Sequence, residues 1–491
     1  MRKSGILMHI SSLPSHFGIG TFGKAAYDFV DFLASTGQSL WQVLPLSPTG
    51  YGDSPYQSFS SFAGNPYFID LEYLEGDGLL KRHEYDGIDW GSDRLRVDYG
   101  KIYKNRFVVL RAACTRLLEN APSDLPRFFE DNAFWLEDYA LFMSLKDRFA
   151  GKPWFLWDKA LRCRDSQALE QARHELAGEI AVIKATQFLF FKQWNALHTY
   201  ANDRGVEIIG DIPIYVAHDS CEVWTEPQLF ILDSELCLVG VAGCPPDNFT
   251  EDGQLWGNPL YNWSTMCSDG FSWWIRRIAH QFEIYDYLRI DHFRGFDSYY
   301  SIPYPSETAR VGEWKKGPGI ELFEALNNAI GPQHYIAEDL GYMTDSVREL
   351  LRVSGFPGMR VLQYAFDSHE DSDHLPHNYI KNCSAYTGSH DNDTILGWFN
   401  GLSENDAKKA VEYMRLIDGE SLPRVMISTL WASVADLAIA TMQDVLELGS
   451  GARMNTPGTR EGNWQWRMPE EALSPDIQNW LLHVTELYGR R

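Results

Sequence analysis

Residues 285–296 read Tyr-Asp-Tyr-Leu-Arg-Ile-Asp-His-Phe-Arg-Gly-Phe, and the rest of the chain can be placed around this stretch. Its apolar, β-prone residues predict a strand, on which side chains alternate between two faces. Arg289 and Asp291 therefore point to the same side. A carboxylate beside a guanidinium stays ionised, which is the state that a covalent nucleophile needs. On this stretch alone, an Arg–Asp pair that only stabilises a strand end explains the pattern equally well.

The composition excludes several classes of protein. The chain has 491 residues and a formal net charge of −24, which argues against nucleic acid as a partner. No apolar run is long enough to span a bilayer, and the short N-terminal run is broken by His9, so neither a membrane protein nor a signal peptide is expected. The seven cysteines stand singly, which is typical of reduced thiols in a cytoplasmic protein. Aromatic residues make up 14% of the chain and suit sugar binding, since their flat faces stack on pyranose rings.

Eight segments carry a strand pattern, and helical patterns separate most of them. The strand segments are residues 5–13, 39–46, 206–216, 286–293, 334–339, 359–366, 383–388 and 435–443. Helices are expected at 23–36, 101–119, 134–149, 165–199 and 271–283. This alternation predicts an α/β fold, a closed (β/α)8 barrel of the TIM type. We expect one catalytic barrel domain over 1–491, with a mainly helical insertion over 70–200.

Two segments after predicted strands are rich in turn residues and aromatics. Residues 48–67 include Tyr56 and contain more aromatic side chains than a solvated connection needs, which favours a binding loop over an ordinary surface connection. Residues 241–261 include Trp256 and are rich in Pro and Gly, so we expect a long functional loop.

Acidic residues follow three of the predicted strands, where a barrel of this type carries its chemistry. Asp291 ends the fourth strand, Glu338 ends the fifth, and Asp391 follows the seventh, directly after His390. Metal binding and glycoside chemistry are the alternatives for such a cluster. No segment has the ligand spacing of a hard-cation loop, so no metal is expected. Glycoside chemistry needs an ionised nucleophile and a protonated acid, which Asp291 and Glu338 would supply if burial raises the pKa of Glu338.

Five motifs resemble those of one known family. They are Gly-Tyr-Gly-Asp-Ser-Pro-Tyr-Gln (50–57), Gly-Gln-Leu-Trp-Gly-Asn-Pro (253–259), Arg-Ile-Asp-His-Phe-Arg-Gly (289–295), Ala-Glu-Asp-Leu-Gly (337–341) and His-Asp-Asn-Asp-Thr (390–394). The chain resembles the amylomaltases, the 4-α-glucanotransferase or disproportionating-enzyme family related to the α-amylases. The resemblance runs nearly end to end, from Ser-Gly-Ile-Leu at 4–7 to Gly-Asn-Trp-Gln-Trp-Arg at 462–467.

The resemblance implies a role for each candidate residue. Asp291 would be the nucleophile, Glu338 the acid/base, and Asp391 a third carboxylate that holds sugar hydroxyls. The residues implied to bind substrate are Tyr56, Arg289, His390, Trp256, Asp211 and Asn463. Tyr56 would stack on a donor sugar. Trp256 would stack on an acceptor sugar, within a loop (241–261) that lies over the active-site cleft. The family works without a cofactor. The implied partners are α-1,4-glucans and maltooligosaccharides, with no nucleic acid and no membrane, and we expect a monomer.

Two places depart from the family pattern. Residues 235–239 read Glu-Leu-Cys-Leu-Val, where the family tends to have a Gly-and-Pro turn. Asn248 follows Pro-Pro-Asp, where an aromatic residue is usual. Neither departure touches the carboxylates, so both bear on acceptor affinity and preferred chain length.

The expected reaction is retaining transfer of α-1,4-glucan segments through a covalent glucosyl-enzyme, with the 4-hydroxyl of a second glucan as the acceptor. An amylase-like retaining hydrolase is the first alternative, because the same carboxylates serve both reactions and only water exclusion separates them. A non-catalytic glucan-binding protein is the second alternative, and the presence of all three carboxylates argues against it.

Overall fold

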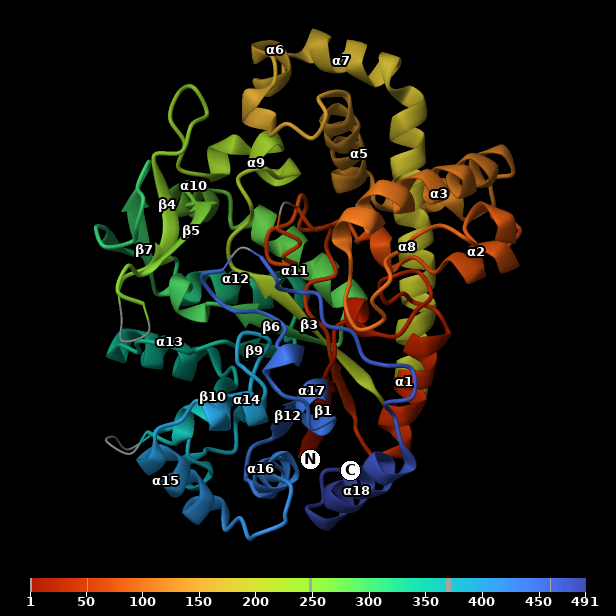
Figure 1. Cartoon of the computed structure of the whole chain (residues 1–491). Coiled ribbons are helices and arrows are strands. Elements are labelled where there is room, and N and C mark those ends of the chain that lie inside the picture. The colour runs from red at the N-terminus through yellow and green to blue at the C-terminus, as the bar shows by residue number, and fades with distance from the viewer. Residues whose placement is uncertain (1, 51, 247–249, 368–371, 460) are drawn as a thin grey trace.

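The predicted (β/α)8 barrel is confirmed. The computed structural model describes residues 2–50, 52–246, 250–367, 372–459 and 461–491. Its parallel strands close in the order β1-β12-β11-β10-β9-β6-β3-β2 (Figure 1). The barrel strands are β1 (Lys3–Leu7), β2 (Leu40–Gln42), β3 (Glu207–Pro213), β6 (Tyr287–Asp291), β9 (Tyr335–Ala337), β10 (Gly358–Val361), β11 (Cys383–Tyr386) and β12 (Leu437–Thr441). Each of them overlaps one of the eight predicted segments.

Helices surround the barrel. Helix α1 (Lys24–Ser35) follows β1. The helices that follow β3 and the later strands are α9 (Cys221–Thr225), α10 (Trp263–Ser268), α11 (Ser272–Ile284), α12 (Ile320–Ile330), α13 (Asp345–Ser354), α14 (Ile395–Asn400), α15 (Glu404–Met414), α16 (Leu422–Ala432), α17 (Met442–Val445) and α18 (Pro475–Leu487). Between β10 and β11 the alternation breaks, because the described residues there form only the 3-10 helices η7 (Leu362–Ala365) and η8 (Pro376–Asn378). The two chain ends lie together, since the Arg490 guanidinium donates to the Lys3 carbonyl at 3.1 Å (Figure 1).

A helical segment separates β2 from β3. Its helices are α2 (Leu71–Gly76), α3 (Tyr99–Glu119), α4 (Leu125–Asp131), α5 (Ala133–Arg148), α6 (Lys159–Arg162), α7 (Ser166–Glu175) and α8 (Ala177–Asp203). The helix expected over 165–199 is therefore two helices, α7 and α8, that meet at Leu176. In Figure 1, α5, α6 and α7 stand at the end of the molecule opposite the chain termini.

Ten of the 21 residues in the segment 241–261 lie in strands, so the long loop expected there was wrong for about half of its length. Strands β4 (Gly240–Cys244) and β5 (Gln254–Pro259) pair antiparallel. With β7 (Ser298–Pro303) and β8 (Glu313–Lys316) they form a separate sheet in the order β5-β4-β7-β8. Glycine misled the prediction: a Cβ on Gly243 would lie 2.2 Å from the carbonyl oxygen of Gln254. Glycine at this position permits two paired backbones to approach, and does not mark a loop.

The barrel register brings the predicted site residues to one rim. Asp211 on β3 pairs with Arg289 on β6, and Pro213 pairs with Asp291. On the other side of β6, Ile290 pairs with Ala337, the residue before Glu338. Because the strands are parallel, their carboxyl ends meet at the same edge. In the described parts of the chain, no helix is both long and apolar enough to cross a membrane.

The close approach of β3 to its surroundings gives a stability prediction. A Cβ added at Gly210 would lie 2.1 Å from the buried ring of Tyr285. Gly210→Ala should therefore lower the free energy of unfolding by about 1–3 kcal/mol, because ring or strand must shift. Gly178→Ala is the matched control: Gly178 lies in the first turn of α8, its added Cβ would meet no atom within 4 Å, and stability should hold or rise slightly. Chemical denaturation of both variants checks this, and equal stabilities would contradict the packing described for β3.

Candidate active site

Arg289 lies at the centre of the candidate site. Its Nη1 donates to both carboxylate oxygens of Asp211, at 2.9 and 2.7 Å, and its Nη2 donates to Oδ1 of Asp291 at 3.0 Å. The predicted shared face of Arg289 and Asp291 is therefore confirmed. Arg289 and Asp211 are buried, whereas the Asp291 side chain is 30% exposed. Of the two acids that Arg289 holds, only Asp291 is open to a ligand.

Glu338 occupies a different environment from Asp291. It is buried directly after β9, and it accepts hydrogen bonds from the backbone N–H groups of His292 (2.7 Å) and Leu340 (2.8 Å). Burial raises the pKa of Glu338 to about 8, and the charge of Asp291 acts in the same direction. Arg289 and the two N–H groups oppose this shift but do not cancel it. Glu338 is therefore mainly protonated at neutral pH, as a general acid must be.

His292 connects the two carboxylates through the backbone. It follows Asp291 directly, and its φ of 55° places it in the left-handed region, which is uncommon for a residue with a side chain. This turn aims the His292 N–H at Glu338. The imidazole is buried, and burial lowers the pKa of His292 to about 3, so the ring is neutral.

Trp256, predicted on the acceptor side, lies on β5 and is half-buried. Its indole meets the His292 ring edge-on at a centroid distance of 4.7 Å, and its Nε1 donates to Oε1 of Gln254 at 3.0 Å. Trp256 thus contacts the residue next to Asp291. The segment 235–239, which departs from the family pattern, lies before β4, and Asn248 lies outside the described residues.

Asp391 lies in the turn after β11, and its side chain is held from the far end of the sequence. Asn455 donates to its Oδ1 at 2.6 Å, and Arg453 donates to its backbone carbonyl at 2.7 Å. The His390 Nε2 lies 3.4 Å from the same Oδ1. Asn455 and Arg453 were missed from the sequence, where the only signal was the Gly-, Asn- and Trp-rich composition of residues 451–468.

Tyr56 connects His390, the residue before Asp391, to the Asp211–Arg289 pair. Its ring stacks on His390 with centroids 4.8 Å apart, and its hydroxyl donates to Oδ2 of Asp211 at 2.9 Å. The indole of Trp464 packs obliquely against both rings, at 5.9 Å from Tyr56 and 5.8 Å from His390. The face of Tyr56 that lies on His390 is occupied, so any sugar contact uses the opposite face or the edge.

Two of the predicted substrate-binding residues have other contacts in this structure. Asp211 has 0% of its surface exposed, so it holds Arg289 and Tyr56 and does not itself reach a sugar. The Asn463 side chain is engaged within its own loop: its Oδ1 accepts from the Thr456 N–H at 2.9 Å, and its Nδ2 donates to the Thr459 carbonyl at 3.1 Å. Asn463 therefore shapes the segment that presents Trp464.

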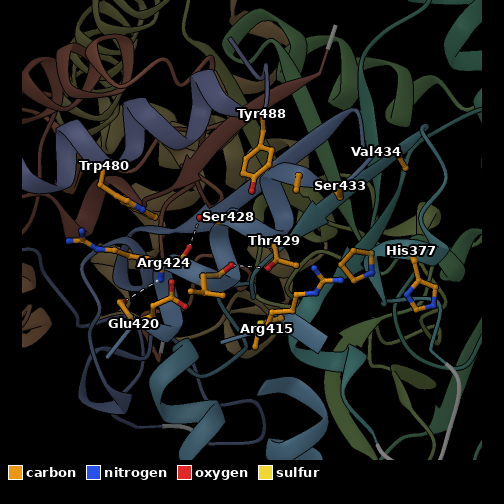
Figure 2. Close-up of a pocket in the computed structure, with 15 residues that line it drawn as sticks. His377, Arg415, Glu420, Arg424, Ser428, Thr429, Ser433, Val434, Trp480 and Tyr488 are labelled. Carbon is orange, nitrogen blue, oxygen red and sulfur yellow. Dashed lines mark hydrogen bonds between the residues drawn. The ribbon is translucent and has the colours of Figure 1, made fainter. Parts of the chain in front are cut away.

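A cavity of about 720 Å³ lies elsewhere, on the outside of the barrel (Figure 2). Its lining comes from η8, α15, α16, α18 and the adjoining turns, and none of the predicted site residues contributes to it. Glu420 is the one acidic side chain among the described residues that line it, so it lacks the paired carboxylates of the strand-end site. Within the described ranges, no group of three His, Cys, Asp or Glu side chains is arranged to hold a metal ion.

Comparison with known proteins identifies a family. The family model described as 4-alpha-glucanotransferase matches residues 8–473. A 4-alpha-glucanotransferase of Streptococcus pneumoniae serotype 4 is 50% identical over 492 residues, covering 100% of this chain and 97% of the relative. The 4-alpha-glucanotransferase of Thermus thermophilus is 46% identical and covers 97% of this chain and 96% of its own length.

Solved structures agree. The amylomaltase from Streptococcus agalactiae in complex with acarbose has a TM-score of 0.98 to this chain at 44% identity, with 100% of each chain covered. The amylomaltase from Corynebacterium glutamicum, at 18% identity and a TM-score of 0.80, shares the fold over 99% of this chain and 75% of its own. A family match over residues 8–473 and relatives of up to 50% identity along the whole chain show that this protein belongs to the 4-alpha-glucanotransferase family.

Proposed function

We propose that this protein is a retaining 4-α-glucanotransferase that moves α-1,4-glucan segments from a donor maltooligosaccharide or longer glucan to the 4-hydroxyl of an acceptor glucan or glucose. One observation carries the assignment of roles: Asp291 is partly exposed beside Arg289, while Glu338 is buried with its pKa raised to about 8 by burial. Two carboxyl groups in environments that separate their protonation states are what double-displacement glycoside chemistry requires. Family membership favours transfer over the amylase-like hydrolase.

In the first step, a carboxylate oxygen of Asp291 attacks the anomeric carbon of the donor and forms an ester bond. The bond from that carbon to the glycosidic oxygen breaks, and the proton of Glu338 passes to the leaving oxygen. The departing glucan leaves with a free 4-hydroxyl. Glu338 is then a carboxylate, which the N–H groups of His292 and Leu340 are placed to stabilise.

In the second step, Glu338 accepts the proton of the acceptor's 4-hydroxyl as that oxygen attacks the anomeric carbon. The ester to Asp291 breaks, and two inversions give overall retention. Both residues return to their starting protonation states. Retaining enzymes place the two carboxyl groups about 5–5.5 Å apart, and the link through the His292 backbone is consistent with such a spacing.

The surrounding residues bind and orient the donor. Arg289 is a positioning residue that fixes Asp291, and buried Asp211 fixes Arg289 in turn. Asp391, oriented by Asn455, accepts hydrogen bonds from donor sugar hydroxyls. His390 and Tyr56 line the same subsite as a stacked pair.

Trp256 binds the acceptor sugar by stacking. Its contact with His292 places it beside the nucleophile but on a different element from Tyr56, His390 and Trp464. An acceptor bound there displaces water from the glucosyl-enzyme, which is the physical basis for transfer instead of hydrolysis.

The ligands we propose are α-1,4-glucans and maltooligosaccharides, which the acarbose complex of the Streptococcus agalactiae amylomaltase supports by full-length similarity. A monomeric state and a cytoplasmic location stay predictions.

Incubation of the pure protein with maltotriose tests the function. Thin-layer chromatography should show glucose together with a ladder of maltooligosaccharides longer than maltotriose. Maltose and glucose without longer products would indicate the hydrolase, and unchanged maltotriose would indicate a binding protein.

Glu338→Gln should separate the two donors. Removing the acid should slow transfer from maltotriose by about 10²–10⁴-fold, the usual contribution of general acid catalysis. The first step on α-maltotriosyl fluoride should be largely spared, because fluoride leaves without a proton, and mass spectrometry should detect the ester on the peptide that contains Asp291. Asp291→Asn is the control, and it should be inactive on both donors. Equal losses on both donors for Glu338→Gln would contradict the acid role.

The pH dependence should follow the raised pKa of Glu338. The group must be protonated in the free enzyme, so kcat/KM for maltotriose should fall as pH rises through about 8, the value to which burial raises this pKa. The first step on α-maltotriosyl fluoride should lack this alkaline limb. A profile for maltotriose that already falls near pH 5, close to the ordinary glutamate pKa, would contradict the assignment.

Trp256→Ala should shift the enzyme from transfer towards hydrolysis. Loss of the acceptor contact should cost roughly 1–3 kcal/mol, the scale for burying one large apolar side chain. The ratio of reducing ends released to glucosyl units transferred from maltotriose should rise, and Trp256→Phe should restore most of the transfer. An unchanged ratio with a markedly lower melting temperature would show that Trp256 only fixes β5 to the barrel.

A further inference from the structure

The cavity on the outside of the barrel has no part in the chemistry described above (Figure 2). Its floor is one face of α16 and its N-cap, from which Ser421, Val425, Ser428, Thr429 and Ala432 line it. These positions recur at intervals of three or four residues, as neighbours on one face of a helix do. Helix α16 has 11 residues, which at 1.5 Å per residue give the floor a length of about 16 Å. The cavity is therefore an elongated groove.

Two walls flank this floor. Trp480, on α18, and Tyr488, directly after α18, form an aromatic wall. Arg415 and Glu420 come from the connection between α15 and α16 and form a charged wall. In Figure 2, Thr429 lies between the two walls. A ligand in the groove thus meets aromatic rings on one side and charged groups on the other.

The aromatic wall is held in place by Arg424. Its guanidinium lies over the indole of Trp480, 5.1 Å from the ring centroid. Two carboxylates fix the guanidinium in turn, because its Nε donates to Glu447 at 2.7 Å and its Nη2 donates to Asp476 at 2.5 Å. A ring that is fixed before a ligand arrives loses little conformational entropy on binding. The groove is therefore preorganised at Trp480.

The lining residues offer both hydrogen-bond donors and acceptors. Within the part of the chain that the structure describes, no protein partner binds the indole N–H of Trp480, the hydroxyl of Tyr488 or the guanidinium of Arg415. The hydroxyls of Ser428 and Thr429 donate to carbonyl groups of α16, at 2.7 and 2.9 Å. Their oxygens keep lone pairs that can accept from a ligand.

This mixture argues against an ionic ligand. An anion only accepts hydrogen bonds, so it would leave the oxygens of Ser428, Thr429 and Glu420 unmatched. A cation would meet the charge of Arg415. Hydroxyl groups both donate and accept, so a neutral ligand with many hydroxyls matches the groove. Trp480 and Tyr488 combine an apolar ring with a polar group, which suits a sugar in the same way.

We propose that this groove is a second carbohydrate-binding site, which holds a stretch of an α-1,4-glucan chain outside the active site. The choice of an α-1,4-glucan rests on the proposed function, whereas the polyhydroxylated class of ligand follows from the groove. No candidate active-site residue lines the groove, so a glucan bound there leaves the active site free. A long glucan held in the groove has its other segments at a raised effective concentration near the active site. A donor too short to reach both sites gains nothing.

The kinetic test compares a long donor with a short one. Trp480→Ala and Arg415→Ala should each lower kcat/KM for transfer from amylose by roughly 3- to 10-fold, the effect of losing one aromatic or hydrogen-bonding contact. The kcat/KM for maltotriose should change by less than about two-fold. Arg127→Ala is the matched control: Arg127 is an exposed arginine on α4, outside the groove, and it should leave both values unchanged. Arg415 is exposed, so its variant should fold even if Trp480→Ala does not.

A binding test uses Asp291→Asn, which should bind glucans without turning them over. Isothermal titration with maltoheptaose should detect two sites per chain, and adding Arg415→Ala should remove one of them. A single site in Asp291→Asn, or equal losses on amylose and maltotriose in Arg415→Ala, would overturn the second site. Binding of inorganic phosphate that depends on Arg415 would overturn the choice of a neutral ligand. If the wild-type protein transfers nothing from maltotriose, the proposed function fails, and the number of maltoheptaose sites still decides whether the groove binds carbohydrate.

Discussion

The guanidinium of Arg289 binds two carboxylates, one buried and one partly exposed, and the geometry of the site depends on these contacts. Its Nη1 donates to both oxygens of the buried Asp211, and its Nη2 donates to Asp291 at the open rim. The charge of Asp291 contributes to the raised pKa of Glu338 nearby, and the charge of Arg289 opposes it. Removing one partner from a buried ion pair typically costs about 3–5 kcal/mol, because the other charge is left uncompensated. Arg289 therefore links the register of β3 and β6 to the ionisation of the site.

Glu338 shows how burial and hydrogen bonding compete at one carboxyl group. Two backbone N–H groups point at its oxygens, an arrangement that favours the carboxylate, yet burial and the charge of Asp291 keep the proton on at neutral pH. Once the proton has left Glu338, the same two N–H groups stabilise the negative charge of the carboxylate. The site is thus built for both protonation states that a double displacement visits, with the protonated state as the resting one.

Local patterns predicted the barrel and its three strand-end acids, because alternation and strand-end position are properties of short segments. The rest depends on contacts that no local pattern records. The glycines of 241–261 resembled a loop, whereas Gly243 serves the close pairing of β4 and β5. Asp211 resembled a ligand contact, and only the packing around it shows that it is covered. Asn455, which orients Asp391, lies 64 residues away in the chain.

The left-handed turn at His292 has a consequence for how this site can vary. It puts the nucleophile and the N–H donor that holds the acid on consecutive residues, at the end of a single strand. The spacing of the nucleophile and this donor is therefore fixed by one peptide unit, and the pairing of β6 with β9 brings the acid to the donor. The sheet that carries Trp256 and the segment that carries Trp464 lie outside these two strands. They can therefore change in length or sequence while β6 and β9 keep the spacing of the two acids. The residues that set the substrate range therefore differ from those that set the stereochemical course. The substrate range can change while the stereochemical course stays the same.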